Sequence, residues 1–237
     1  MYYGPGYYYF DPTYVLVLLG MVLCLGASAY VNSTMRKYKR EKLASGLTGA
    51  EAAKRILYEE GLYGVQVECL DSDSGDHYDP RTNTVRLSYS VYNTASVTAV
   101  AVAAHECGHA LQHEEEYVFL NIRSALVPVV NIASNIGMPM IILGVILSWN
   151  QVLIQIGIMA FLLAVVFQLV TLPVEFNASG RALRKLNQYG LLNSAQILDA
   201  RKVLVAAALT YVAAAASSIL QLLRLYLLFG GNRRRRD

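Results

Sequence analysis

Two histidines and a glutamate stand at a spacing that suits metal-dependent chemistry. His105, Glu106 and His109 lie in the run HECGH, which follows an alanine- and valine-rich stretch over residues 96–104 that is typical of a helix. Residues four positions apart lie on one helical face, so both imidazoles can reach one metal ion. Glu106 turns its carboxylate toward the same cavity, where it can deprotonate a metal-bound water. Three of the chain's four histidines fall between His105 and His113, which makes a chance match less plausible.

This spacing is the H-E-x-x-H pattern of zinc metallopeptidases. It predicts one Zn²⁺ per chain and assigns Glu106 the role of catalytic general base. A helix that merely carries polar residues is the alternative. Cys107 lies inside the pattern, but helical rotation turns its side chain away from the histidines, so packing is its predicted role.

A catalytic zinc usually takes three protein ligands, so a third must come from elsewhere. Glu175 follows the third apolar segment of the chain, two membrane crossings after the histidines, and so lies on the same side of the membrane. A carboxylate at the edge of an apolar run is costly unless it is paired or ligating. An interfacial carboxylate without a metal is the alternative. His113, one turn beyond His109, is a second candidate for a ligand, an oxyanion contact or a surface residue.

Long apolar segments account for the hydrophobic content of 55%. Four of them are long enough to cross a bilayer core of about 30 Å, at residues 13–30, 126–149, 152–174 and 203–229. Gln221 and Arg224 make the second half of the last segment less apolar. The expected fold is a mainly α membrane protein with about four transmembrane helices and a small α+β cytoplasmic, zincin-like catalytic unit.

The expected organisation has five parts. An aromatic leader and first anchor (1–31) precede a cytoplasmic catalytic unit (32–124), a transmembrane hairpin (125–174), a cytoplasmic helix with the third ligand (175–202), and an apolar helix with a basic tail (203–237). Within the catalytic unit, a capping box at Thr48 and Glu51 opens a helix that ends near Gly61. Strands are expected at residues 65–70 and 84–89, with a turn at 71–76 between them.

The positive charges predict the orientation in the membrane. Basic residues follow the first apolar segment, whereas the first twelve residues carry none, so the positive-inside rule places the catalytic unit in the cytoplasm. The leader tyrosines (Tyr2, Tyr3, Tyr7, Tyr8, Tyr9), together with Tyr14, are typical of an interfacial belt. The tail at Arg233–Arg236 breaks the charge pattern if the last helix crosses fully. Cys24, Cys69 and Cys107 have no paired spacing and are expected to be reduced thiols.

Several longer motifs resemble one family. They are DHYDP (76–80), VRLS (85–88), AAHECGHALQ (103–112), PVEFNASGRA (173–182) and LTYVAAA (209–215). The chain resembles the YugP-like neutral zinc metallopeptidases of bacterial membranes, which are similar to the HtpX and CAAX-protease group. In that group a glutamate in an E-x-x-A-D context completes the zinc site, which implies Glu175 as the third ligand. Ser179 replaces the acidic residue here, and Asn177 and Gly180 stand where the family favours Asp and Arg.

The resemblance implies a multi-pass protein of the bacterial cell membrane that hydrolyses protein or peptide substrates, membrane proteins among them. Its partners would be these substrates and the lipid bilayer, not nucleic acid; the oligomeric state stays open. Oxyanion stabilisation or support of the ligands falls to His113, Arg181, His77, Asn177 and Ser179. An expected substrate-binding strand, which could instead be structural, consists of Thr84, Val85, Arg86, Leu87 and Ser88.

Three other classes fit the residues less well. A site-2-type intramembrane protease needs a distant Asp ligand in a membrane helix, and residues 126–174 contain no Asp. A catalytically silent zinc-binding scaffold or adaptor would not need Glu106. A metal transporter would need polar ligands within the membrane segments, where Gln155 and Gln168 are equally suited to hydrogen-bonding between helices.

Overall fold

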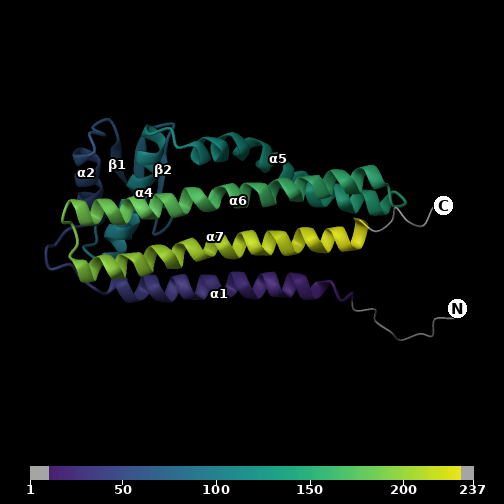
Figure 1. Cartoon of the computed structure of the whole chain (residues 1–237), viewed down its shortest axis with the longest axis horizontal. Helices are drawn as coiled ribbons and strands as arrows, with labels where there is room; N and C mark the ends of the chain where they lie inside the picture. Colours follow the sequence, from purple (N-terminus) through teal and green to yellow (C-terminus); the bar gives the residue numbers. More distant parts are fainter. Residues whose placement is uncertain (1–10, 231–237) are drawn as a thin grey trace. The chain divides into compact units, whose positions relative to one another are not determined.

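The computed structural model describes residues 11–230, so the leader tyrosines and the basic tail lie outside the described residues. Long helices dominate the chain, and a small sheet lies between the first and the later helices in sequence (Figure 1). The elements are α1 (Tyr14–Lys39), α2 (Gly49–Glu59), β1 (Gln66–Leu70), β2 (His77–Asp79), β3 (Thr84–Ser88), α3 (Tyr89–Tyr92), α4 (Val97–Glu114), α5 (Val118–Ile146), α6 (Gln151–Gln188) and α7 (Ser194–Phe229).

Four of the helices in residues 11–230 are long and apolar enough to cross a membrane, namely α1, α5, α6 and α7. Their most apolar windows have mean hydropathies between 1.9 and 2.5, in agreement with the four predicted segments. At 38 residues, α6 is about 57 Å long, nearly twice a bilayer core. α7 is one uninterrupted helix of 36 residues. Both helices therefore have length to spare beyond a membrane crossing.

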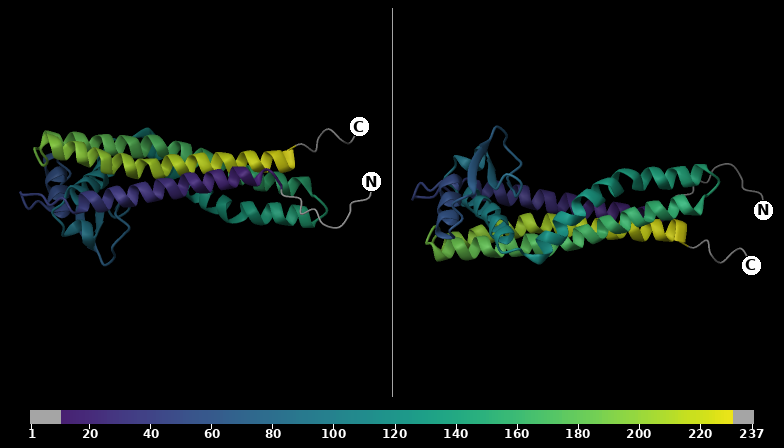
Figure 2. Two further views of the ribbon diagram at one scale, coloured as in Figure 1. Left: turned by 90° about the horizontal axis from the view of Figure 1, so that it is seen from below. Right: turned by 90° about the horizontal axis from the view of Figure 1, so that it is seen from above.

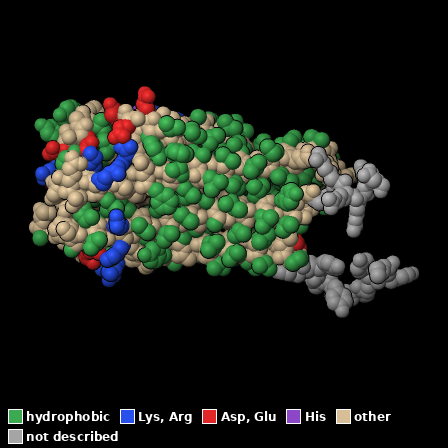
Figure 3. Space-filling model, viewed as in Figure 1, with side chains coloured by type: hydrophobic (Ala, Val, Ile, Leu, Met, Phe, Trp, Pro, Cys, Tyr) green, Lys and Arg blue, Asp and Glu red, His purple; other side chains and the backbone are tan. Residues whose placement is uncertain are grey.

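The chain forms two compact units. Among the described residues, the first contains 11–25, 128–168 and 213–230, and the second contains 26–127 and 169–212. Large hydrophobic side chains of the first unit are exposed, among them Val22, Ile132 and Met159, each at least 61% exposed. On the face shown in Figure 3, hydrophobic side chains cover the first unit, whereas Lys, Arg, Asp and Glu side chains gather over the second. An apolar exterior is what a lipid environment requires.

The sheet of the second unit has the strand order β1-β3-β2. β1 pairs with β3 in parallel and β2 pairs with β3 in antiparallel register. The strands predicted at 65–70 and 84–89 are thus confirmed as β1 and β3, while the three-residue β2 was not expected. It begins at His77, directly after the predicted turn.

The position of β3 corrects one expectation about substrate binding. β1 pairs along all of β3 and β2 covers the other edge at Thr84–Arg86, so no further strand can be added along these three residues. Its side chains hold the sheet instead. Arg86 donates from Nε to Glu68 (3.1 Å) on β1 and from Nη1 to Asp79 (2.8 Å) on β2. The hydrogen bond from Arg86 lowers the pKa of Asp79 to about 2, so this cross-strand pair stays charged.

Two capped helices build the core of the second unit beside the sheet. The predicted capping box is confirmed: Thr48 accepts a hydrogen bond from the backbone of Glu51, whose carboxylate accepts one from the backbone of Thr48. Ser96 caps α4 by accepting from the Ala99 amide. Small side chains let α2 and α4 approach closely, and the facing residues Ala52, Ala53, Val100, Ala103 and Ala104 are all fully buried. This packing fixes the axis of α4, which carries the histidines.

The second half of α6 and the first half of α7 complete the second unit. They run antiparallel, joined by a short turn at residues 189–193 (Figures 1 and 2). Gly190 adopts a φ of 61° in this turn, a conformation that favours glycine. Ala182 and Leu186 of α6 and Val203 of α7 are buried in the same core as α4. As a result, the part of α6 that follows residue 169 is held against the histidine helix.

Candidate metal centre

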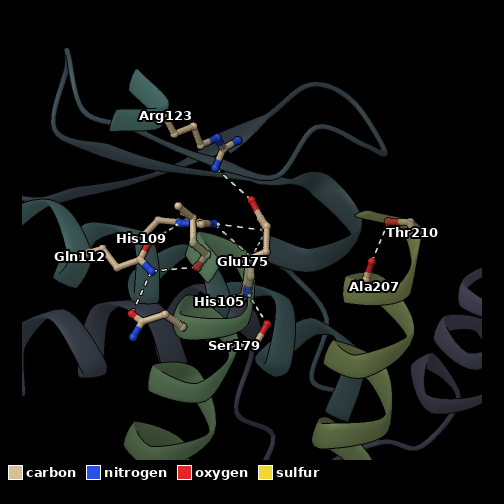
Figure 4. Close-up of polar contacts among 10 residues, drawn as sticks. His105, His109, Gln112, Arg123, Glu175, Ser179, Ala207 and Thr210 are labelled. Carbon is tan, nitrogen blue, oxygen red and sulfur yellow. Dashed lines mark hydrogen bonds and ion pairs between the residues drawn. The ribbon is translucent and has the colours of Figure 1, made fainter. Parts of the chain in front are cut away.

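Three predicted ligands converge between α4 and α6. The Nε2 atoms of His105 and His109 are 3.1 Å apart, and Oε2 of Glu175 lies 3.3 Å from the first and 3.8 Å from the second (Figure 4). Tetrahedral bonds of about 2.0–2.1 Å place neighbouring ligand atoms about 3.3–3.4 Å apart. The three donor atoms therefore have the separation that one zinc ion requires, and the residues are those of a possible metal site.

The Glu175 carboxylate is the clearest sign that a cation belongs here. The residue is 2% exposed, and its Oε2 atom is buried without a hydrogen-bond partner among the described residues. The other oxygen, Oε1, accepts a hydrogen bond of 3.0 Å from Nη1 of Arg123 on α5. Burying a charged carboxylate oxygen is costly unless it pairs with a cation or binds a metal. Oε2 points at the two imidazoles and can bind a metal ion together with them.

A glycine lets the two helices approach closely enough for this convergence. Gly108 lies between the histidines on α4, and a Cβ atom built there would be 2.5 Å from the carbonyl oxygen of Ala178 on α6. Ala178 itself is fully buried and lies one turn after Glu175. Any larger residue at position 108 would push α6, and with it the third ligand, away from the histidines.

Hydrogen bonds to Nδ1 orient both imidazoles. Nδ1 of His105 lies 3.1 Å from Oγ of Ser179, and Nδ1 of His109 lies 3.0 Å from Oε1 of Gln112. When Nδ1 carries the proton and donates it, Nε2 presents its lone pair to the metal. The structure thus places Ser179 where the sequence analysis expected a supporting residue, and it adds Gln112 to that set.

Gln112 is in turn fixed by a polar network that reaches α6. It is fully buried, and its Nε2 donates to the carbonyl of Val174 (2.8 Å) and to Oδ1 of Asn177 (2.9 Å). Arg181 donates to the same Asn177 oxygen (2.7 Å) and to Glu115 (2.6 Å). Arg181, one of the oxyanion candidates, is therefore engaged in holding Asn177, and Asn177 acts through Gln112 on His109.

The charge of the cluster favours cation binding. Burial opposes protonation of His109, but the nearby carboxylates of Glu175 and Glu106 outweigh burial and raise its pKa. A proton and a metal ion compete for the same imidazole nitrogen. Metal affinity is therefore expected to fall as the pH drops through this raised pKa.

Two cavities meet at the cluster. One has a volume of about 260 Å³ and the other about 290 Å³; both have mixed linings, and the first is the more apolar of the two. Their shared wall consists of Asp76, His105, Glu106, Glu175 and Tyr211. Glu106 is 7% exposed, so its carboxylate faces these cavities and not bulk water. The shared wall thus brings two of the candidate metal ligands and the Glu106 carboxylate to both cavities.

Two of the predicted histidines line only the polar cavity. Nδ1 of His113 forms a hydrogen bond of 3.0 Å with the Tyr78 hydroxyl, so His113 lies outside the three-ligand cluster. Nδ1 of His77 bonds to the carbonyl of Gly75. Both residues can contact a substrate in this cavity, but neither completes the metal site.

Sequence reasoning missed four residues of the site: Asp76, Gln112, Arg123 and Tyr211. Asp76 and Tyr211 lie within two of the motifs, DHYDP and LTYVAAA, that carried the family resemblance. Arg123 lies at the start of an apolar segment, where an ionised residue is as unusual as Glu175 is at the end of another. An unpaired arginine and an unpaired glutamate at the ends of two apolar segments would have been a usable sign of their contact.

Comparison with known proteins agrees with this site. Residues 13–230 match the family described as "Putative neutral zinc metallopeptidase", so the chain belongs to this family of zinc metallopeptidases. A relative from Bacillus subtilis (strain 168), described as "Putative membrane protease YugP", is 46% identical over 214 residues, which is 90% of this chain and 95% of the relative. The resemblance to YugP-like proteins is thereby confirmed. No solved structure matches the chain significantly.

Proposed function

We propose that this chain is a membrane-embedded zinc endopeptidase that holds one Zn²⁺ through His105, His109 and Glu175. The observation that carries the proposal is the buried Oε2 of Glu175, which accepts no hydrogen bond from the described residues and lies 3.3 and 3.8 Å from the Nε2 atoms of the two imidazoles. The family, whose description names a zinc metallopeptidase, supports the choice of metal. A general base beside the ligands makes hydrolysis a better reading than a purely structural zinc site.

The roles of the residues follow from their positions. When bound, the metal would polarise the scissile carbonyl and acidify a water molecule. Glu106, in the wall of both cavities, takes a proton from the attacking water and passes it to the leaving amine. Tyr211 lines the same two cavities and carries a hydroxyl, so we assign it as the hydrogen-bond donor to the oxygen on which negative charge develops.

The shape of the site favours cleavage within a chain over removal of a terminal residue. Two cavities share the wall that contains His105, Glu106 and Glu175, so a polypeptide can occupy one cavity with residues before the scissile bond and the other with residues after it. β2 pairs only with β3, and its residues His77 and Tyr78 line the polar cavity. An extended substrate can add to the outer edge of β2, which replaces the expectation that it adds to residues 84–88.

The distribution of positive charge supports a cytoplasmic active site. The last turn of α1 carries Arg36, Lys37 and Lys39, and it belongs to the unit that contains the metal ligands. Arg184 and Lys185 on α6 belong to the same unit. Under the positive-inside rule, these residues favour a cytoplasmic position for the second unit.

The decisive experiment compares the full-length protein with its Glu106→Gln variant, purified in detergent and in lipid vesicles. Both should hold about one zinc per chain, because Glu106 is not a ligand. Wild type should cleave an unfolded casein-type substrate, and the variant should be slower by about 10²- to 10⁴-fold because it lacks the general base.

Glu114→Gln is the matched control, since it removes an exposed glutamate from the same helix. It should retain full zinc content and full activity. Equal cleavage by wild type and Glu106→Gln would refute the enzymatic role. Full zinc occupancy with no cleavage by either protein would identify a zinc-binding scaffold.

A further inference from the structure

One of the two cavities beside the metal ligands is built like a pocket for an apolar side chain. Beyond the shared wall, its apolar lining consists of Met35 of α1, Val102 of α4, and Val203, Leu204, Ala207 and Ala208 of α7, and Gly75 and Ser179 complete the lining. Val203, Leu204 and Ala208 are each at most 5% exposed, so this side of the pocket is anchored in the protein core. Figure 4 shows the turn of α7 that carries Ala207 beside the cluster.

The second cavity has a different character. Beyond the shared wall its lining comes from three segments (β2 with the following turn, α4 and α5), and its polar and charged groups include His77, Tyr78, His113, Asn121 and Arg123 beside a few apolar residues. The imidazoles, the phenol and the guanidinium offer hydrogen bonds to the backbone or to polar side chains of a bound chain. The metal ligands thus lie at the boundary between an apolar and a polar compartment.

We propose that the protease selects substrates with a large apolar side chain next to the scissile bond, bound in the pocket formed by Met35, Val102, Val203, Leu204, Ala207 and Ala208. The inference rests on the proposed function, since the shared wall supplies the catalytic groups. With the scissile carbonyl at that wall, the side chain on one side of the bond enters the apolar cavity. Its volume of about 260 Å³ accommodates a leucine or a phenylalanine.

The lining also indicates how selectivity is set. Ala207 and Ala208 leave the space open because their side chains are short, whereas Met35 is flexible and adapts to occupants of different shape. A hydrophobic pocket discriminates by about 10- to 200-fold for each methylene that it can bury. A charged side chain would lose its hydration in this pocket without gaining a partner on the α7 side. Leucine and phenylalanine substrates should therefore be preferred over alanine, and alanine over aspartate.

The test uses the full-length, zinc-loaded protein and fluorogenic decapeptides that differ only in one residue beside the scissile bond: Leu, Phe, Ala or Asp. Mass spectrometry verifies that each is cut at the same bond. Wild type should show kcat/KM at least about 10-fold higher for Leu than for Ala. Ala207→Leu fills the pocket, so it should lose this preference by slowing the Leu and Phe peptides about 10-fold while still cutting the Ala peptide.

Val205→Leu is the matched control on α7. Val205 is 49% exposed and does not line the pocket, so this variant should keep the wild-type preference. Zinc content and thermal unfolding of Ala207→Leu should equal those of wild type, which separates a filled pocket from a misfolded protein. Equal wild-type rates on Leu and Asp peptides, or an equal slowing of all four peptides by Ala207→Leu, would overturn the proposal.

Binding provides a readout that does not depend on catalysis. Fluorescence anisotropy of labelled Leu and Asp peptides with zinc-loaded Glu106→Gln should give at least about 10-fold tighter binding of the Leu peptide. If no peptide is cleaved by wild type but this binding preference persists, the proposed hydrolysis fails while the apolar pocket stands. If cleavage occurs without any preference in rate or binding, the pocket fails while the protease stands.

Discussion

A glycine brings two helices into backbone contact in each unit of this chain, with very different consequences. In the first unit, a Cβ atom at Gly157 of α6 would lie 2.6 Å from the carbonyl oxygen of Gly137 on α5. In the second, a Cβ at Gly108 of α4 would lie 2.5 Å from the carbonyl of Ala178 on α6. Small residues at a crossing are the usual way for membrane helices to pack closely.

The difference lies in what flanks each crossing. Around Gly157 the neighbours are aliphatic, such as Ile141, so close packing yields van der Waals contact and nothing else. Around Gly108 the neighbouring turns carry His105 and His109, and the facing helix carries Glu175 and Ser179. The same close packing therefore gives an apolar hairpin in one unit and a candidate metal site in the other, because polar residues flank only the second crossing.

The largest expected effect comes from adding one methyl group at each crossing. Gly108→Ala should destabilise the protein by about 1–3 kcal/mol, because the new Cβ meets backbone that cannot yield. It should also weaken zinc binding by about 100-fold or more, because it moves Glu175 away from the histidines. Gly157→Ala should cost similar stability but leave zinc affinity unchanged. Zinc competition titration measures the affinity, and thermal unfolding measures the stability. An equal loss of zinc affinity in the two variants would contradict a specific role for the crossing at Gly108.

Two tyrosines on α7, one in each unit, test whether the second unit alone carries catalytic residues. Tyr211 lines both cavities of the second unit, whereas Tyr226 belongs to the first unit and is 64% exposed. Tyr211→Phe should lower kcat by about 10²- to 10³-fold, with little change in KM or zinc content, because it removes an oxyanion donor. Tyr226→Phe should leave all three quantities unchanged. A wild-type kcat for Tyr211→Phe would remove this residue from the mechanism.

An arginine pair sharpens the comparison further. Arg123 donates to Glu175 in the second unit, and Arg224 in the first unit lies 3.7 Å from Asp11 and over the ring of Tyr14. Arg123→Gln should weaken zinc binding by about 10- to 100-fold, because Glu175 loses the partner that fixes its orientation. Arg224→Gln should change thermal stability alone. Zinc titration of both variants measures this effect. An unaltered zinc affinity in Arg123→Gln would show that Arg123 is not needed to position Glu175.

The smallest expected effect concerns the hydrogen bond to His105. Ser179→Ala removes the partner of Nδ1 and should weaken zinc binding by about 10-fold, at the low end for residues that orient a ligand. Ser179→Asp should strengthen binding instead, because a carboxylate accepts the imidazole proton more strongly and raises ligand basicity. Ser217→Ala in the first unit is the control without effect. Equal affinities for the Ala and Asp variants would contradict an orienting role for position 179.

Much of this architecture could be predicted from the sequence because it depends on local spacing. The four-residue interval of His105 and His109 follows from helical periodicity, and the apolar runs are long enough to identify α1, α5, α6 and α7 as candidate spans. Even the third ligand could be inferred, because an ionised group beside an apolar run needs a partner. Each of these features depends only on residues that are close together in the sequence.

The tertiary structure decided the rest, because the partners are far apart in the chain and no local pattern links them. Arg123 meets Glu175 across 52 residues, Gln112 meets Asn177 across 65, and Ser179 meets His105 across 74. The alternation of side chains along a strand does not predict the order of strands in the sheet. For this reason β3 was expected to bind substrate, although it is the central strand. The sequence by itself determined which groups could bind zinc, and the close approach of helices at Gly108 decided that they meet.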